Sequence, residues 1–127
     1  MEHVVIVIAL ALIEYIGFSI MVGVARGKYN CPAPAVSGDP IFERYYRVQQ
    51  NTLEQLIIFL PAITIYGYYG NPDVAAGVGL IFVISRLVYF QAYVSDPAKR
   101  GRGFVPGFFA NAFLLIGGLI AAVNNIF

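Results

Sequence analysis

The sequence predicts an all-α membrane protein, a single-domain bundle of four transmembrane helices, and three observations predict it. The chain has 127 residues, of which 59% are hydrophobic and only 12% are charged, whereas a soluble domain of this length carries far more surface charge. The apolar residues gather in four runs. Three runs reach the roughly 20 residues that cross a bilayer, and the second reaches them if its helix begins upstream of its apolar part.

We therefore expect one domain over residues 1–127, with helices at about 3–26, 39–69, 72–94 and 105–127. The first helix opens on Met1-Glu2-His3, without basic residues, and its apolar run is too long for a signal peptide, so we expect it to be retained. Asp39-Pro40 and Asn71-Pro72 fit the second and third helix starts, because Asp or Asn caps a helix whose first position is proline.

The basic residues predict the orientation in the membrane. Seven of the eight flank the connections between the first and second helices and between the third and fourth, and the eighth lies in the nearest half of the third helix. They are Arg26, Lys28, Arg44, Arg47, Arg86, Lys99, Arg100 and Arg102. The positive-inside rule then places both termini on the non-cytoplasmic side.

A polar stripe opens the second helix. Arg44, Arg47, Asn51 and Glu54 are spaced 3, 4 and 3 apart and share one helix face. Charge within a membrane helix is costly and indicates a functional site. The stripe suits a small zwitterion that carries several carboxylates. Its alternative, a solvated helix start whose charges snorkel, explains Arg44 and Glu43 but not the deeper Asn51 and Glu54.

Depth in the bilayer suggests partners for the other buried charges. At about 1.5 Å per residue, Glu54 lies about 6 Å inside the cytoplasmic boundary and Arg86 about 10 Å, which predicts a structural ion pair between them. Glu14 lies about 18 Å inside, so it is either protonated or paired across a subunit contact. Tyr89 and Tyr93 share the face of Arg86, either as interfacial anchors or as ligand contacts.

Several functions have no support in the sequence. The net charge of +1 gives no support to a nucleic-acid partner. A metal site has no candidate ligands, because the one histidine, His3, stands at the outer terminus and the one cysteine, Cys31, sits in a loop. Walker A, GxGxxG, CxxC and HExxH motifs are absent from the sequence.

Three segments together resemble one family. The segment ERYYRVQQNTLE at 43–54, followed by Pro61, resembles the signature of the MAPEG family, the membrane-associated proteins in eicosanoid and glutathione metabolism. SRLVYFQAY at 85–93 resembles its second conserved block, and DPAKRGRG at 96–103 is most similar to the microsomal glutathione transferases. The resemblance carries specific residues from about 25 to 109.

This resemblance implies a homotrimer that binds glutathione as co-substrate, without a metal, between neighbouring subunits at the cytoplasmic end. The implied glutathione contacts are Arg47, Asn51, Glu54, Tyr89, Tyr93 and Arg100, with Arg26 and Gln49 from the neighbouring subunit. Arginines suit the carboxylates of glutathione and Glu54 suits its ammonium. Arg100, which would stabilise the thiolate, and Tyr93 are the implied catalytic residues.

The implied function is that of a membrane-bound glutathione S-transferase, with an accompanying glutathione peroxidase activity. It would detoxify lipophilic electrophiles or lipid hydroperoxides that arrive from the bilayer along an apolar groove of the first and fourth helices. Gly27 and Gln55 stand where leukotriene-forming synthases have arginine and tyrosine, which argues against a leukotriene or prostaglandin synthase. Arg47 and Glu54 favour an enzyme over the non-enzymatic lipoxygenase-activating branch.

Two alternatives remain open at this point. One is a non-enzymatic lipid-binding or scaffold protein of the same fold. The other is a small channel or carrier with Glu14, Glu54 and Arg86 as its polar path. The absence of a dilysine retention signal favours a bacterial inner membrane over the endoplasmic reticulum.

Overall fold

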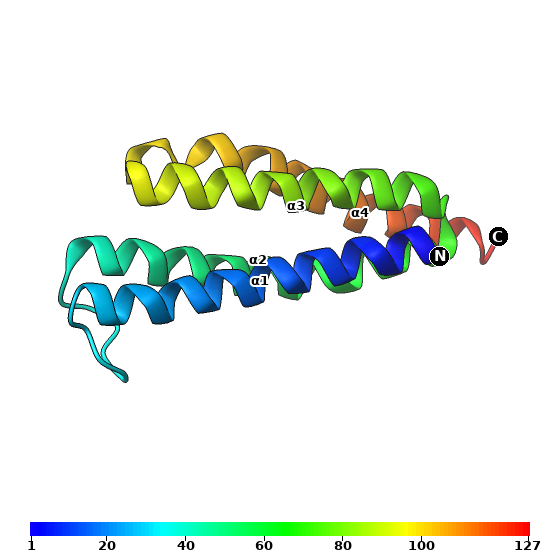
Figure 1. Ribbon diagram of the computed structural model, residues 1–127. Coiled ribbons are helices and arrows are strands. Elements are labelled where there is room, and N and C mark those ends of the chain that lie inside the picture. Colours follow the sequence, from blue (N-terminus) through cyan, green and yellow to red (C-terminus); the bar gives the residue numbers. More distant parts are fainter.

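The computed structural model describes all residues, 1–127, and the chain is helical throughout, apart from its connections. The elements are α1 (Glu2–Lys28), α2 (Pro40–Tyr69), α3 (Pro72–Ser95), the short 3-10 helix η1 (Pro97–Lys99) and α4 (Gly101–Asn124). The four long helices run side by side, with both chain termini and the α2–α3 turn at one end (Figure 1). The prediction of an all-α bundle of four helices is confirmed.

The two Asx-Pro pairs cap helices as predicted. The Asp39 side chain accepts hydrogen bonds from the backbone N–H groups of Ile41 and Phe42, at 2.8 and 3.1 Å. Asn71 does the same for Asp73 and Val74 at the start of α3. Each cap satisfies amides that lack a partner within the helix.

The last helix differs from its predicted bounds of about 105–127. It begins at Gly101 and ends at Asn124, so Pro106 lies inside it. Pro106 is the sixth residue of this helix and has no N–H, so the hydrogen bond that another residue there would donate to the carbonyl of Arg102 is missing. The connection from α3 is therefore short: Asp96 caps η1 by accepting from the N–H of Ala98.

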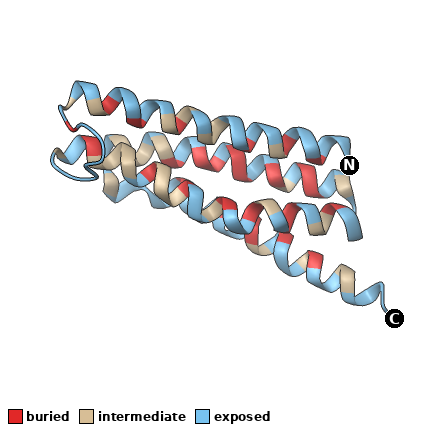
Figure 2. Ribbon diagram, turned by 90° about the horizontal axis from the view of Figure 1, so that it is seen from below, coloured by how far each residue is buried: buried red, intermediate tan, exposed pale blue.

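Apolar side chains from all four helices form the core. Phe59 of α2 and Phe82 of α3 stack at its centre, with ring centroids 4.1 Å apart. Buried residues follow the inward sides of the helices, and α4 diverges from the others toward the C-terminus (Figure 2). The outward sides carry large apolar residues such as Ile13 and Ile57, which are 63% and 68% exposed. Such surfaces suit hydrocarbon rather than water.

Three segments are long and apolar enough to cross a membrane: α1, α3 and the stretch Pro97–Asn124. The first half of α2 is polar, so this helix is not among the segments that are apolar enough by themselves. Because α2 has 30 residues and lies along the 27-residue α1, it spans the same thickness. The chain is an integral membrane protein.

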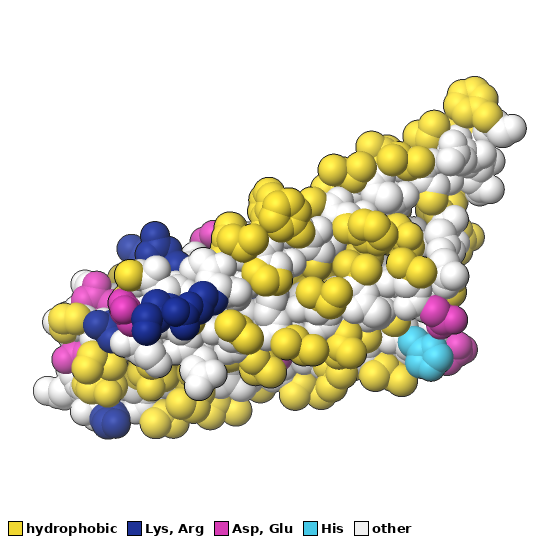
Figure 3. Space-filling view, turned by 90° about the horizontal axis from the view of Figure 1, so that it is seen from above, with side chains coloured by type: hydrophobic (Ala, Val, Ile, Leu, Met, Phe, Trp, Pro, Cys, Tyr) yellow, Lys and Arg dark blue, Asp and Glu magenta, His cyan; other side chains and the backbone are white.

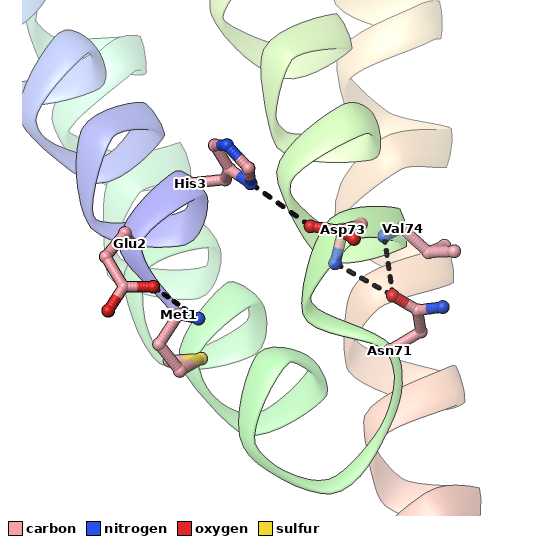
Figure 4. Close-up of polar contacts among 6 residues, drawn as sticks. All are labelled: Met1, Glu2, His3, Asn71, Asp73 and Val74. Atoms are coloured by element: carbon pink, nitrogen blue, oxygen red, sulfur yellow. Dashed lines mark hydrogen bonds and ion pairs between the residues drawn. The ribbon is translucent and has the colours of Figure 1, made fainter.

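The two ends of the bundle differ in charge. Basic side chains gather at the end that holds the α1–α2 and α3–α4 connections, and the histidine lies at the other end (Figure 3). At that second end His3 Nδ1 lies 3.1 Å from Asp73 Oδ1, which joins α1 to α3 (Figure 4). The only other ion pair within the chain joins the Met1 amino group to Glu2 beside it.

Candidate functional site

A polar cleft opens at the basic end of the bundle. Its volume is about 560 Å³, which falls in the range of roughly 300–1,000 Å³ typical of small-molecule sites. It is walled by α2, by α3 and by the segment that leads into α4. The lining residues are Asn51, Glu54, Gln55, Arg86, Tyr89, Ala98, Arg100, Gly101 and Phe104.

A glycine contact between α4 and α3 gives the cleft its shape. A Cβ atom on Gly103 would collide with the backbone nitrogen of Tyr89 and would lie 2.5 Å from the carbonyl oxygen of Ser85. Only glycine lets the two backbones approach so closely. The first turn of α4 is thereby held against α3, with Arg100 and Gly101 in the cleft wall.

Arg86 lies at the base of this cleft and is only 1% exposed. Its Nη2 donates to Thr52 Oγ1 at 2.9 Å, and its guanidinium lies 4.0 Å from the centroid of the Tyr89 ring. Its Nε is buried and has no hydrogen-bond partner. Arg86 therefore joins α3 to α2 from within the core.

The predicted ion pair between Glu54 and Arg86 is not formed within this chain. Both residues line the cleft, but Arg86 is bound by Thr52, and Glu54 forms no ion pair. Thr52 and Glu54 are two positions apart and point about 200° from each other around α2. Glu54 and Arg86 were matched by their depth in the membrane, and depth does not give the direction in which a side chain points around its helix. The Glu54 carboxylate is exposed.

The tyrosines of α3 connect the cleft with a neighbouring hollow. Asn51 Nδ2 donates to the Tyr89 hydroxyl at 2.5 Å, and the rings of Tyr89 and Tyr93 lie 5.6 Å apart. Tyr93 lines a second hollow of about 320 Å³ together with Arg47. Arg100 of the cleft donates to the carbonyl of Pro97, which also lines that hollow.

The structure brings together six of the eight predicted contact residues. Asn51, Glu54, Tyr89 and Arg100 line the cleft, while Arg47 and Tyr93 line the adjoining hollow.

The other two predicted contacts lie elsewhere in the chain. Arg26 Nη1 donates to the carbonyls of Cys31 and Ala35 in the α1–α2 connection. Gln49 Nε2 donates to Ser19 Oγ of α1 at 3.1 Å. Their action from a neighbouring subunit stays a prediction.

Sequence reasoning overlooked a pair of amides at the cleft. Gln55 lines it, and Gln55 Oε1 accepts a hydrogen bond from Asn111 Nδ2 of α4 at 3.2 Å. The available signal was the presence of two amides within apolar membrane segments, where polar side chains are costly.

An apolar groove lies on α1, as predicted, but its second wall is α3 rather than α4. It measures about 580 Å³ and contains one charged residue, Glu14, whose Oε2 is buried without a hydrogen-bond partner. A separate apolar hollow of about 500 Å³ lies on α4 alone, around Phe109 and Phe113.

The fold and the cleft define a class: an integral membrane helical bundle that carries a polar, arginine-bearing small-molecule cleft at its basic end. The chain belongs to the MAPEG family, whose sequence model matches residues 4–120. The family resemblance of the three segments is confirmed.

Its relatives include one uncharacterized protein and two named enzymes. An uncharacterized protein of Synechocystis sp. is 39% identical over 116 residues, which cover 91% of this chain and 85% of that protein. Microsomal glutathione S-transferase 2 of Bos taurus is 38% identical over 108 residues, covering 85% of this chain and 74% of the enzyme. Leukotriene C4 synthase of Bos taurus is 36% identical over 83 residues, covering 65% of this chain and 55% of the synthase. A glutathione-related function in a membrane is therefore supported.

Proposed function

We propose that the protein is a membrane-bound glutathione S-transferase that ionises the thiol of glutathione and transfers the sulfur to lipophilic electrophiles. The observation that carries this proposal is the cleft that unites Arg100, Glu54, Asn51 and Tyr89 in one chain. The similarity to microsomal glutathione S-transferase 2 supports it independently.

The charges around the cleft complement those of glutathione, which has two carboxylates, one ammonium and one thiol. Arg47 in the adjoining hollow offers a guanidinium that can bind a carboxylate through two hydrogen bonds. Glu54 offers a carboxylate to the ammonium, and its exposure leaves it free to do so. Asn51 and Tyr89 hold one another at the base of the cleft and present further hydrogen-bonding groups.

Catalysis requires the thiolate, because a free thiol has a pKa of about 8.5 and is mostly protonated at neutral pH. Arg100 stands at the N-terminus of α4, without a side-chain capping hydrogen bond, and Gly101 lines the cleft beside it. The guanidinium and the positive end of the helix dipole both favour an anion here. The Tyr93 hydroxyl in the adjoining hollow is a further donor to the sulfur.

The thiolate then attacks either a carbon atom of an electrophile or the terminal oxygen atom of a lipid hydroperoxide. With an alkyl or aryl electrophile, the thiolate forms a C–S bond and the leaving group departs with its electron pair. With a lipid hydroperoxide, the thiolate takes the terminal oxygen, the O–O bond breaks and the lipid alcohol leaves. A second glutathione then converts the sulfenic acid to the disulfide and water. This second route would add a peroxidase function in detoxification.

We further propose a homotrimer with glutathione between neighbouring subunits. Glu54 is exposed in the single chain although the depth count places it about 6 Å inside the cytoplasmic boundary, and Arg47 is exposed about two turns before it along α2. Exposure of charge at that depth is costly, so a neighbouring subunit that covers both residues would relieve it. Arg26 and Gln49 would then approach the ligand from that neighbour. A bacterial inner membrane is the proposed location.

Titration of the purified protein with glutathione tests the proposal. We expect the ultraviolet absorption band of a thiolate to appear near neutral pH, with release of a proton, and we expect conjugation of an aryl halide. If glutathione produces no thiolate band and no conjugate forms, the protein is not a glutathione transferase.

The apolar groove on α1 and α3 favours one alternative, a non-enzymatic lipid-binding or scaffold protein of the same fold. That alternative predicts lipid binding that is unchanged by saturating glutathione. It also predicts that replacing Arg100 leaves lipid binding unchanged.

A further inference from the structure

A further hollow lies on the outward side of α3 and α4, at the basic end of the bundle. Its volume is about 330 Å³, and its lining residues are Val88, Gln91, Ala92, Ser95, Lys99 and Arg102. On α3, Gln91 of this hollow and Tyr89 of the cleft are two positions apart, so they point about 200° from each other. On α4, the same holds for Arg102 and Phe104. The hollow is therefore separate from the cleft.

The two cations of this hollow, Lys99 and Arg102, have no partner within the chain. Both are exposed, and neither side chain forms a hydrogen bond or an ion pair. The nearby Arg44 and Arg100, by contrast, donate to backbone carbonyls at 2.9 and 3.0 Å. The carboxylate of Asp96 accepts from the N–H of Ala98 and does not line the hollow. The hollow therefore presents two positive charges without a counter-charge.

The outward face of α3 changes from polar to apolar with increasing distance from this end. One stripe of exposed residues, spaced 3 and 4 apart, consists of Ile81, Ile84, Val88, Gln91 and Ser95. From Gln91 to Ile81 the stripe extends about 15 Å, which is half of the roughly 30 Å hydrocarbon core. Figure 3, seen from the side of α3 and α4, shows the same change from basic to hydrophobic side chains. We call this row of residues the α3 stripe.

We infer that the hollow and the α3 stripe together bind one anionic glycerophospholipid of the leaflet at the basic end. The phosphate lies between Lys99 and Arg102. The glycerol and ester groups lie beside Ser95 and Gln91, and one acyl chain lies along the apolar part of the α3 stripe. This site is distinct from the proposed glutathione site and does not depend on it.

The side chains suit each part of such a lipid. A guanidinium can donate two hydrogen bonds to a phosphate, and the lysine ammonium adds a second positive charge. Ser95 Oγ donates to the carbonyl of Gln91 at 2.8 Å, which leaves its lone pairs for a glycerol hydroxyl. The Gln91 amide meets either a hydroxyl or an ester oxygen, whichever way it is turned. Basic pockets at the membrane surface select anionic head groups, whereas the choline of a zwitterionic lipid adds a positive charge next to the two cations.

Fluorescence quenching by brominated lipids tests the inference. The chain contains no tryptophan, so Ile84→Trp places a single fluorophore on the α3 stripe, one turn from Val88 of the hollow. The protein is placed in phosphatidylcholine vesicles that contain a minor fraction of lipid with brominated acyl chains, either phosphatidylglycerol or phosphatidylcholine. Since each Lys or Arg near the surface contributes a factor of roughly five, phosphatidylglycerol should be preferred by about 5- to 25-fold.

Substitution of the two cations tests where the lipid binds. Lys99→Gln and Arg102→Gln should each lower the preference roughly fivefold in the Ile84→Trp background. Lys28→Gln is the matched control, because Lys28 is exposed at the same end and lies outside the hollow, so the preference should stay nearly unchanged. Unchanged thermal unfolding in detergent shows that each variant is folded. Ile81→Trp replaces Ile84→Trp if that variant does not fold.

Three results would overturn the inference. Equal quenching by the two lipids would show that the hollow does not select an anionic head group. An equal loss of preference with Lys28→Gln would show a general attraction of the basic end to an anionic membrane. Displacement of the brominated lipid by soluble glycerol 3-phosphate in excess would show that the hollow binds free phosphate groups rather than a lipid. Because glutathione is absent from the vesicles, none of these results bears on the transferase function.

Discussion

Arg86 carries the most enclosed charge in the molecule, and its hydrogen bonding depends on one hydroxyl group. Thr52 Oγ1 is the only side-chain acceptor that it meets, and Thr52 is itself 0% exposed. The guanidinium also lies over the Tyr89 ring, with its central carbon 4.0 Å from the ring centroid. A buried guanidinium is tolerated only while such partners are in place.

Replacing Thr52 by valine should therefore destabilise the fold. Valine has nearly the same shape and no acceptor, so the free energy of unfolding should fall by about 1–3 kcal/mol, or more because the donor is charged. Unfolding in detergent, followed by circular dichroism, measures this. Thr64→Val is the control, since the Thr64 hydroxyl is exposed and binds only the carbonyl of Leu60 in its own helix. Equal effects of the two substitutions would contradict the role of Thr52.

Arg100 and Arg47 should separate catalysis from binding. Arg100→Ala removes the cation next to the thiolate, so kcat should fall about 100-fold while glutathione affinity changes little. Arg47→Ala removes a carboxylate contact, so glutathione binding should weaken roughly tenfold. Calorimetry of glutathione binding and steady-state rates measure the two effects. If both variants lose the same property, the roles assigned to these arginines are incorrect.

At the scale of residues, the sequence predicts which side chains line the cleft better than it predicts which side chains form hydrogen bonds with each other. Asn51, Glu54, Tyr89 and Arg100 could be placed together from their spacing and the family resemblance. The partner of Arg86 could not, because depth along a helix says nothing about direction around a neighbouring helix. The contact between Gln55 and Asn111 could not be predicted for the same reason.

At the scale of elements, the first turn of α4 depends on glycine at its contact with α3. The predicted start of this helix, at about residue 105, left Gly101 and Gly103 in the preceding connection. Those glycines instead begin the helix and bring its backbone onto α3. A glycine that permits a turn and one that permits a close helix contact look alike in a sequence, so the difference becomes visible only when α3 is in place.

Gly103→Ala should displace this turn. Its Cβ would meet the backbone of α3, which has no flexible side chain to move aside. We expect α4 to shift away from Tyr89, and both stability and the rate of conjugation to fall. The unfolding temperature and kcat measure the two effects.

Gly77→Ala in α3 is the matched control for Gly103→Ala. A Cβ at Gly77 meets nothing within 4 Å. Alanine is a better helix former than glycine by up to about 1 kcal/mol, so this variant should be as stable as wild type or more so. Loss of stability there would show that glycine is required in this bundle for some reason other than close contact.

At the scale of the whole molecule, the uneven charge of the two ends predicts the orientation. The basic end should face the cytoplasm and both termini should face away from it. In a background where Cys31 is replaced by serine, single cysteines at the exposed positions Ser37 and Phe127 report the two sides. In intact cells, a membrane-impermeant maleimide should label the terminal position and spare the loop. The reverse pattern would invert the orientation.

The proposed trimer predicts the size of the purified particle. Light scattering in detergent should give a protein mass of three chains of 13.9 kDa. Charge reversal of Glu54 to lysine should weaken assembly if a neighbour covers that residue, because a like or unpaired charge is costly at an interface. A monomer that binds glutathione with full affinity would contradict the shared site.

The hydrogen bonds of α2 are distributed very unevenly along its length. Every side-chain hydrogen bond from α2 to another helix comes from residues 44–55, next to the cleft. The opposite half of α2 meets its neighbours through apolar packing alone, as in the stack of Phe59 on Phe82. Hydrocarbon solvates such surfaces as well as another helix does, so only close fit holds that half together. Apolar solutes or short-chain lipids should therefore swell the distal half of the bundle while the hydrogen-bonded half keeps its shape.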